Sequence, residues 1–204
     1  MGAGEVALLA LRHAPTAWNR LGKIQGHRDV GLDAEGRAAL AGRCLPPRFA
    51  AFRWVSSPLA RCQETASLLG ASELALEARI QEMDWAEWEG LSLVELRRRA
   101  PAAMAENEAR GLDFRPEGGE SPREVRERVG GWLSELLAAG EDTVMVSHKG
   151  VIRALLSAAT GWDMQGKPPV KLDWRCAHLF AVGAGGCPRL ATANIPLVER
   201  GEGR

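Results

Sequence analysis

Short apolar segments that alternate with capped helical segments dominate this chain of 204 residues. The clearest of them is Glu5–Leu11 (EVALLAL), which is too short for a buried helix and is typical of a buried strand. Asp142–Ser147 (DTVMVS) has the same character. Strands that alternate with helices predict an α/β fold, a three-layer sandwich with a mostly parallel central sheet.

The remaining elements follow from shorter patterns. Further strands are expected at Arg53–Ser56, in the weaker stretch Leu74–Gln81, and at Leu172–Val182 and Leu190–Ala193. Helices are expected after Asp33 as N-cap, and from a Ser57 cap with Pro58 in the first turn to about Gly70. A third helix should run from Leu91 to about Arg110. The last two should run from the capping box Ser121-Pro122-Arg123-Glu124 to about Ala139, and over Val151–Thr160. The tail Glu199–Arg204 is expected to fray.

Composition excludes several classes of protein. Lys+Arg and Asp+Glu both total 26, so no global field favours nucleic acid or an acidic membrane surface. No apolar run approaches the roughly 20 residues of a membrane helix, and Met1–Glu5 does not begin a signal peptide, so we expect a cytoplasmic protein. The four cysteines form no CxxC pair and no zinc-ligand spacing, which favours reduced thiols. We expect one domain, as a monomer or a homodimer.

Basic residues and histidines follow three of the predicted strands. Arg12 and His13 end the first strand, Arg61 lies just beyond the second, and His148 and Lys149 follow the strand that ends at Ser147. Ligands of parallel α/β sheets bind beyond the carboxyl ends of the strands, so these side chains should meet in one crevice. Arginines and a helix start are suited to a phosphate group.

Six segments, in chain order, resemble motifs of the histidine phosphatase superfamily, in its phosphoglycerate mutase-like branch. They are Leu11–Asn19 (LRHAPTAWN), Gln25–Leu32 (QGHRDVGL), Ser56–Ala66 (SSPLARCQETA), Glu82–Gly90 (EMDWAEWEG), Glu117–Ser121 (EGGES) and Val146–Arg153 (VSHKGVIR). Each motif alone is modest evidence, whereas six in the right order make the resemblance specific.

The resemblance implies a phosphoglycerate mutase-like fold, with one histidine phosphatase domain over 1–204 and a helical insertion at about 91–119 over the active site. It also implies a phosphomonoester hydrolase that acts on a small phosphorylated metabolite, without metal or other cofactor. The roles it implies are a nucleophile that becomes phosphohistidine (His13), a proton donor to the leaving group (Glu82), phosphate-binding groups (Arg12, Asn19, Arg61, His148) and weaker substrate contacts (Gln25, Lys149). A neutral imidazole is a competent nucleophile near neutral pH, and fixed cationic donors stabilise the charge of the transition state.

Some residues depart from the family pattern. Ala14 and Ala86 stand where glycines are usual, and Lys149 stands where a small residue is common. Alanine is tolerated if its backbone does not need a positive φ. Asp84, Glu87 and Glu89 could suggest a cation site, but a solvated surface is the better interpretation.

Two other functions stay open beside the phosphatase. A cofactor-dependent phosphoglycerate mutase would share the first half-reaction, but its usual basic residues cannot be matched in Leu91–Arg115. A phospho-ligand binding module without activity would not need an acid such as Glu82.

Overall fold

The computed structural model describes residues 2 and 4–201. Its main helices and strands are, in chain order, β1 (Val6–Arg12), α1 (Ala17–Arg20), α2 (Ala34–Leu40), β2 (Arg43–Cys44), β3 (Arg53–Ser56), α3 (Ala60–Leu69), β4 (Ala75–Leu76), α4 (Leu93–Arg99), α5 (Pro101–Glu108), α6 (Pro122–Ala139), β5 (Thr143–Ser147), α7 (Lys149–Thr160), β6 (Ala177–Gly183), β7 (Cys187–Ile195) and β8 (Val198–Glu199). Five short 3-10 turns, η1 to η5, connect them.

The central sheet has six strands in the order β4-β3-β5-β1-β6-β7. The strands β4, β3, β5 and β1 are parallel, whereas β6 runs antiparallel to β1 and β7 antiparallel to β6. The predicted mostly parallel sheet is confirmed. The two late strands form an antiparallel hairpin because only the three-residue turn η5 joins them, which is too short for a parallel crossover.

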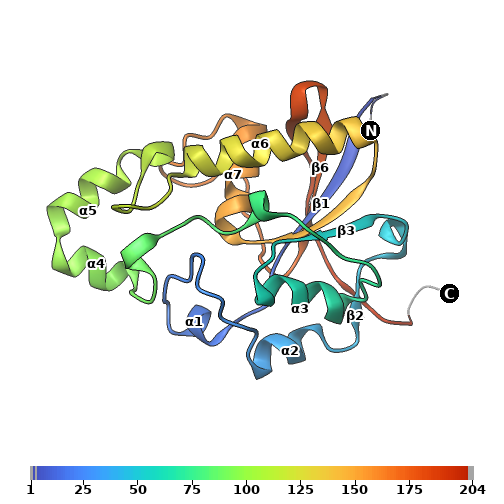
Figure 1. Cartoon of the computed structure of the whole chain (residues 1–204), viewed down its shortest axis with the longest axis horizontal. Helices are drawn as coiled ribbons and strands as arrows, with labels where there is room; N and C mark the ends of the chain where they lie inside the picture. Colours follow the sequence, from blue (N-terminus) through green and yellow to red (C-terminus); the bar gives the residue numbers. More distant parts are fainter. Residues whose placement is uncertain (1, 3, 202–204) are drawn as a thin grey trace.

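Helices cover both faces of the sheet, as Figure 1 shows for α6 and α7 on one side and α2 and α3 on the other. Successive side chains of a strand point to opposite faces, so β1 contributes to two cores. Leu8 and Ala10 pack in the core beneath α6 and α7, while Leu9 and Leu11 pack in the core beneath α2 and α3. The predicted three layers are therefore confirmed.

Local signals placed most helix ends correctly. Asp33 caps α2 by accepting from the Gly36 N–H, and Ser121 begins α6 with a complete capping box. Gly70 and Gly140 end α3 and α6 in the left-handed conformation that glycine adopts without strain.

Several predicted boundaries are wrong. The helix after β3 begins at Ala60 rather than Pro58, and its first N–H donates to the distant carboxylate of Asp29 at 2.7 Å. The segment 91–110 is two helices, because Pro101 at the first position of α5 cannot continue the hydrogen bonding of α4.

The weak strand predicted at 74–81 shrinks to β4 followed by the 3-10 turn η2 (Ala78–Ile80). The late strand begins at Ala177, five residues after the predicted Leu172, and β7 is longer than the predicted Leu190–Ala193. The expected fraying is wrong at Glu199, which pairs with Arg43.

Met1, Ala3 and residues 202–204 lie outside the described residues. The fraying expected for 202–204 and the expectation about Met1–Glu5 fall on them in whole or in part. Among the residues that the structure describes, no helix combines the length and the apolar character needed to cross a membrane.

The helices α4 and α5 extend sideways from the layered body (Figure 1). They are held by a small apolar cluster in which Leu96 and Met104 of these helices meet Ile24 of the loop after α1. Trp85 and Phe114 pack against both this cluster and the core beneath α6 and α7. Through these contacts, α4 and α5 pack against the segment that carries Glu82.

Candidate active site

The carboxyl ends of β1, β3 and β5 bring the predicted residues together. Arg12 of β1 lies opposite Ser147 of β5, and the His13 N–H donates to the Ser147 carbonyl at 2.9 Å. The first residue after β3, Ser57, donates its N–H to the Val146 carbonyl at 3.0 Å. As a result, the imidazole rings of His13 and His148 lie with centroids 5.3 Å apart.

His13 is nearly completely buried, with 4% of its surface exposed. Its Nδ1 lies 2.8 Å from the carbonyl oxygen of Ala14. A carbonyl oxygen only accepts hydrogen bonds, so Nδ1 carries the proton and the lone pair lies on Nε2. Burial, and then the positive charges of Arg12 and Arg61, lower the pKa of His13 well below its ordinary value. The ring is therefore a neutral base at neutral pH.

Two guanidinium groups accompany this imidazole, that of the buried Arg61 and that of the half-buried Arg12. Arg61 is fully buried and donates to the carbonyl oxygens of Arg28 and Gly26, each at 2.8 Å. The Nε atoms of Arg12 and Arg61 are buried without a hydrogen-bond partner among the described residues. A buried donor without a partner costs about 1–3 kcal/mol. An anion bound here would supply the missing acceptors.

His148 is held by residues that the sequence had not pointed to. Its Nε2 lies 2.8 Å from the hydroxyl of Ser57 and 3.4 Å from the sulfur of Cys62. Burial, and then the neighbouring His13 ring and the charge of Arg61, lower the pKa of His148 well below its ordinary value. Ser57, predicted as a helix cap, instead orients this ring. Its position directly after a strand end was the available signal.

Glu82 lies on the loop after η2, facing the start of α7. The Gly150 N–H donates to both of its carboxylate oxygens, at 3.1 and 3.3 Å, and the Met83 N–H donates to Oε1 at 3.0 Å. A Cβ at Gly150 would lie 2.3 Å from Oε1 of Glu82. With the Glu82 carboxylate in this position, only glycine fits at residue 150.

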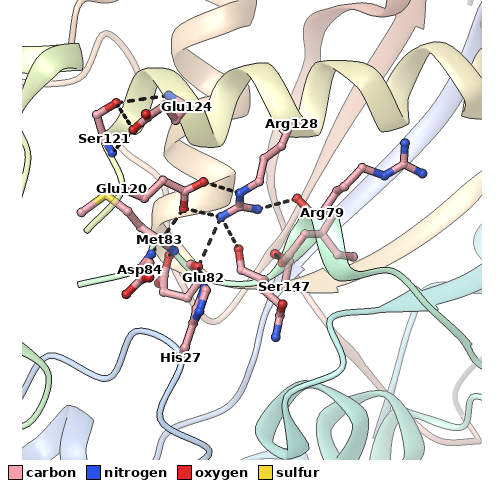
Figure 2. A network of polar contacts seen from close by, with 12 residues as sticks. His27, Arg79, Glu82, Met83, Asp84, Glu120, Ser121, Glu124, Arg128 and Ser147 are labelled. Atoms are coloured by element: carbon pink, nitrogen blue, oxygen red, sulfur yellow. Dashed lines mark hydrogen bonds and ion pairs between the residues drawn. The ribbon is translucent and has the colours of Figure 1, made fainter. Parts of the chain in front are cut away.

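The backbone of this loop is clamped by Arg128 of α6 (Figure 2). The guanidinium donates to the carbonyl oxygens of Arg79, Gln81 and Glu82, the last two at 2.9 and 3.2 Å. It also donates to both carboxylate oxygens of Glu120, at 2.6 and 2.9 Å. Glu120 in turn accepts from the backbone N–H of the segment that follows Glu82 at 3.3 Å. Arg128 lies outside every sequence motif and was not predicted to belong to the site.

Three other predicted residues lie around this centre. Asn19 accepts from the Thr16 N–H at 3.0 Å and borders the same cavity as Arg12. Gln25 is buried and accepts from the Thr16 hydroxyl at 2.9 Å. Lys149 is exposed and stands over the indole ring of Trp174 at 5.7 Å.

Two cavities adjoin the centre. One, of about 450 Å³, is bordered by Arg12, His13 and Trp174. The other, of about 380 Å³, is bordered by Glu82, Lys149 and the residues of α4, α5 and η4 that face them. The residues 91–119 thus form part of the wall beside Glu82.

The two alanines that replace glycines differ in their backbone. Ala86 has a φ of 46°, in the left-handed region where alanine is strained by about 1–2 kcal/mol. The φ of Ala14, by contrast, is not in the positive range. Alanine in place of glycine at position 86 therefore strains the backbone, which the sequence pattern alone did not reveal.

Two acidic residues near Glu82 accept hydrogen bonds from backbone N–H groups. Glu89 accepts from the N–H groups of His27 and Arg28, and Asp84 accepts from that of Ala86. The side chain of His27 supports the same loop, with its Nε2 2.9 Å from the Glu82 carbonyl oxygen. Across residues 2 and 4–201, no three His, Cys, Asp or Glu side chains gather at metal-binding distance. All four cysteines are free thiols, as predicted.

The fold and this centre define a phosphate-handling enzyme of the phosphoglycerate mutase-like type. The profile of the histidine phosphatase superfamily (branch 1) matches residues 8–195, and the chain belongs to that superfamily. The predicted family is thereby confirmed, and with it the predicted class of enzyme, a histidine phosphatase.

Known proteins of this superfamily include both phosphatases and mutases. The chain is 33% identical over 177 residues to a glucosyl-3-phosphoglycerate phosphatase of Mycolicibacterium vanbaalenii (79% of this chain, 77% of the relative). It is 32% identical over 190 residues to a 2,3-bisphosphoglycerate-dependent phosphoglycerate mutase of Methylobacterium radiotolerans (84% and 90%). A mycobacterial glucosyl-3-phosphoglycerate phosphatase solved with inorganic phosphate superposes with a TM-score of 0.77 at 25% identity, covering 94% of this chain and 98% of that one.

Proposed function

We propose that this enzyme hydrolyses the phosphomonoester of a small metabolite through a phosphohistidine at His13. The observation that carries the proposal is the pairing of a neutral imidazole, with its lone pair on Nε2, and two guanidinium groups whose buried Nε–H donors lack partners among the described residues. The first provides a nucleophile and the second a binding place for the phosphoryl oxygens. The phosphatase relatives support this assignment.

In the first half-reaction, Nε2 of His13 attacks phosphorus and the bond from phosphorus to the ester oxygen breaks. The electron pair of that bond stays on the ester oxygen, which takes a proton from the protonated carboxyl group of Glu82. The alcohol leaves, Glu82 becomes a carboxylate and the phosphoryl group is on His13. An alkoxide is a poor leaving group, so proton donation should account for much of the rate on alkyl esters.

In the second half-reaction, water attacks phosphohistidine while the Glu82 carboxylate accepts a proton from that water. The bond between phosphorus and Nε2 breaks, inorganic phosphate forms, and His13 returns as a neutral base. Glu82 is then protonated again for the next turnover.

The phosphoryl oxygens would be held by Arg12, Arg61, Asn19 and His148. Cationic donors in a site with little water stabilise the charge spread over the equatorial oxygens of the transition state. Gln25 and Lys149 are weaker candidates for contacts to the substrate. We further propose that residues 91–119 act as a cap within a single domain, that the reaction needs no metal, and that the enzyme is cytoplasmic, as a monomer or a homodimer.

The nucleophile is tested by His13→Ala with p-nitrophenyl phosphate as substrate. Turnover should fall by at least a thousandfold, and acid-quenched wild-type enzyme should carry an acid-labile phosphate that the variant lacks. Retained turnover in a correctly folded variant would exclude this assignment.

The acid is tested by Glu82→Gln on two esters. The variant should lose about a hundredfold or more on an alkyl phosphate and far less on p-nitrophenyl phosphate, whose leaving group needs no proton. Equal losses on both esters would remove Glu82 from the role of proton donor.

Hydrolase and mutase activities separate on 3-phosphoglycerate, with and without 2,3-bisphosphoglycerate. A phosphatase releases inorganic phosphate in both cases. Formation of 2-phosphoglycerate that depends on the bisphosphate, without release of phosphate, would replace the hydrolase by the mutase alternative.

A further inference from the structure

The guanidinium of Arg12 carries a charge that no anionic side chain balances directly. Its Nε is buried without a hydrogen-bond partner, and no carboxylate of the described residues forms an ion pair with it. Arg61, by contrast, is held in place by two backbone carbonyl oxygens. Ordering a long side chain only when the substrate binds costs free energy. A contact that holds Arg12 beforehand would therefore favour the binding of a phosphoryl group.

Arg12 makes such a contact with the indole ring of Trp174. The guanidinium carbon of Arg12 lies over this ring, 5.9 Å from its centre, and Nζ of Lys149 lies over the same ring at 5.7 Å. A cation within about 6 Å of the centre of an indole ring is attracted by the negative face of the ring. An aromatic face attracts the cation without neutralising its charge, whereas a carboxylate would neutralise it and accept from its N–H groups. The indole can thus hold Arg12 and leave its charge available to an anion.

The segment that carries Trp174 is itself held by β7. The side chain of Asn194 accepts from the Asp173 N–H at 2.6 Å and donates to the Lys171 carbonyl oxygen at 3.0 Å. The Asn194 N–H donates to Nδ1 of the buried His178 at 3.2 Å. The ring of His178 packs against the indole, with centroids 6.3 Å apart and the two planes at 81°. These contacts hold both the segment beside Trp174 and the indole ring.

Trp174 lies at the phosphoryl centre and not beside the proton donor. It borders the cavity that contains Arg12 and His13, and it is not part of the lining of the cavity beside Glu82. Burial, and then the charge of Arg12, lower the pKa of Lys149, so the two cations are close enough to repel each other. A shared aromatic face offsets part of this repulsion.

We propose that Trp174 is a positioning residue that holds the Arg12 guanidinium at the phosphoryl centre by a cation–π contact. The inference rests on the proposed phosphatase function, which assigns Arg12 to the phosphoryl oxygens. The ring keeps Arg12 within reach of the phosphoryl group before the substrate binds. The π-electron density at position 174, and not only the bulk of the side chain, then controls the affinity for phosphate.

The test replaces Trp174 by increasingly fluorinated tryptophans, because ring fluorine withdraws π-electron density with little change of shape. The Kd of inorganic phosphate, measured by calorimetry, should rise stepwise to about threefold to tenfold above that of the wild-type enzyme. Trp174→Phe should retain more of the affinity than Trp174→Leu, since only phenylalanine presents an aromatic face. Trp54 is the matched control, because it is also half-buried and carries no cation of the described residues. The same analogues at position 54 should leave the Kd unchanged.

A Kd that does not respond to fluorination at position 174 would overturn the proposal, whether or not Trp174→Leu folds. A loss of affinity confined to phosphate esters, with unchanged affinity for inorganic phosphate, would also overturn it, because the ring would then contact the alcohol part. The response should persist in Lys149→Met, and its disappearance there would show that the ring acts through Lys149 instead of Arg12.

Turnover of p-nitrophenyl phosphate and the His13 phosphate trap report on the proposed function separately. Their failure would refute the phosphatase. Normal turnover with a Kd that does not respond to fluorination would refute only the positioning role of Trp174.

Discussion

Removing the guanidinium of Arg128 tests whether the loop of Glu82 owes its position to α6. Arg128→Met keeps a long side chain of similar volume and good helix propensity. It leaves the carbonyl oxygens of Arg79, Gln81 and Glu82 and the carboxylate of Glu120 without their shared donor. The acid itself is untouched by the substitution, so any effect on it acts through the backbone.

The size of the effect follows from burial and from the number of bonds lost. The side chains of Arg128 and Glu120 are 21% and 18% exposed, so water can partly replace the lost contacts. Breaking a fully buried pair costs about 3–5 kcal/mol, and partial exposure reduces this to about 2–3 kcal/mol. For a chain of this size, that loss lowers Tm by about 4–12 °C.

The assay combines thermal unfolding with kinetics on an alkyl phosphate and on p-nitrophenyl phosphate. Arg128→Met should lose at least about tenfold in kcat on the alkyl ester and much less on the aryl ester, because in the proposed mechanism only the alkyl ester needs the proton of Glu82. In a Glu82→Gln background the substitution should have little further effect on kcat.

Arg123→Met is the matched control, because Arg123 lies on the same helix in a more exposed pair with Asp113. It should change stability by less than about 1 kcal/mol. Arg128→Lys should recover part of the alkyl-ester rate, since an ammonium group can still donate to some of the carbonyl oxygens. Equal losses on both esters, or losses that add to those of Glu82→Gln, would refute the positioning role.

Three further predictions concern the same centre. Gly150→Ala should slow alkyl-ester hydrolysis about tenfold, because its Cβ would displace Oε1 of Glu82, while Gly130→Ala, in open space on α6, should leave turnover unchanged; equal rates in the two variants would contradict this. The free energy of unfolding without phosphate should fall as the pH drops below the ordinary histidine value of 6.5, because unfolding lets His13 and His148, whose pKa values are lowered in the fold, take up protons. Each histidine contributes about 1.4 kcal/mol per pH unit to the slope of the free energy of unfolding against pH. His13→Gln should reduce this slope by that amount when the free energy is measured by chemical unfolding at several pH values. An unchanged slope would show that the ring is not held neutral. Treatment with EDTA should leave turnover unchanged, and loss of activity that zinc or magnesium restores would contradict a reaction without metal.

The layered α/β architecture and most of the helix ends could be predicted from the order of the residues alone. The continuous apolar run of β1, the capping box at Ser121 and the glycine that ends α6 are local signals, and each depends on residues within a few positions of one another. The gathering of His13, Arg61 and His148 was also predictable, because parallel strands bring the residues at their carboxyl ends to one edge of the sheet.

The distant groups that hold His148 and the loop of Glu82 could not be predicted, because they depend on how the elements pack. Ser57 seemed a helix cap, but packing places its hydroxyl on His148, and Asp29 satisfies the first N–H of α3 instead. Arg128 and Arg153 look like ordinary helix arginines, and no local pattern reports that one clamps a loop and the other borders a cavity. A sequence pattern records what a residue does for its own element. The partners that a side chain meets across elements depend on how those elements pack, which no short stretch of sequence contains.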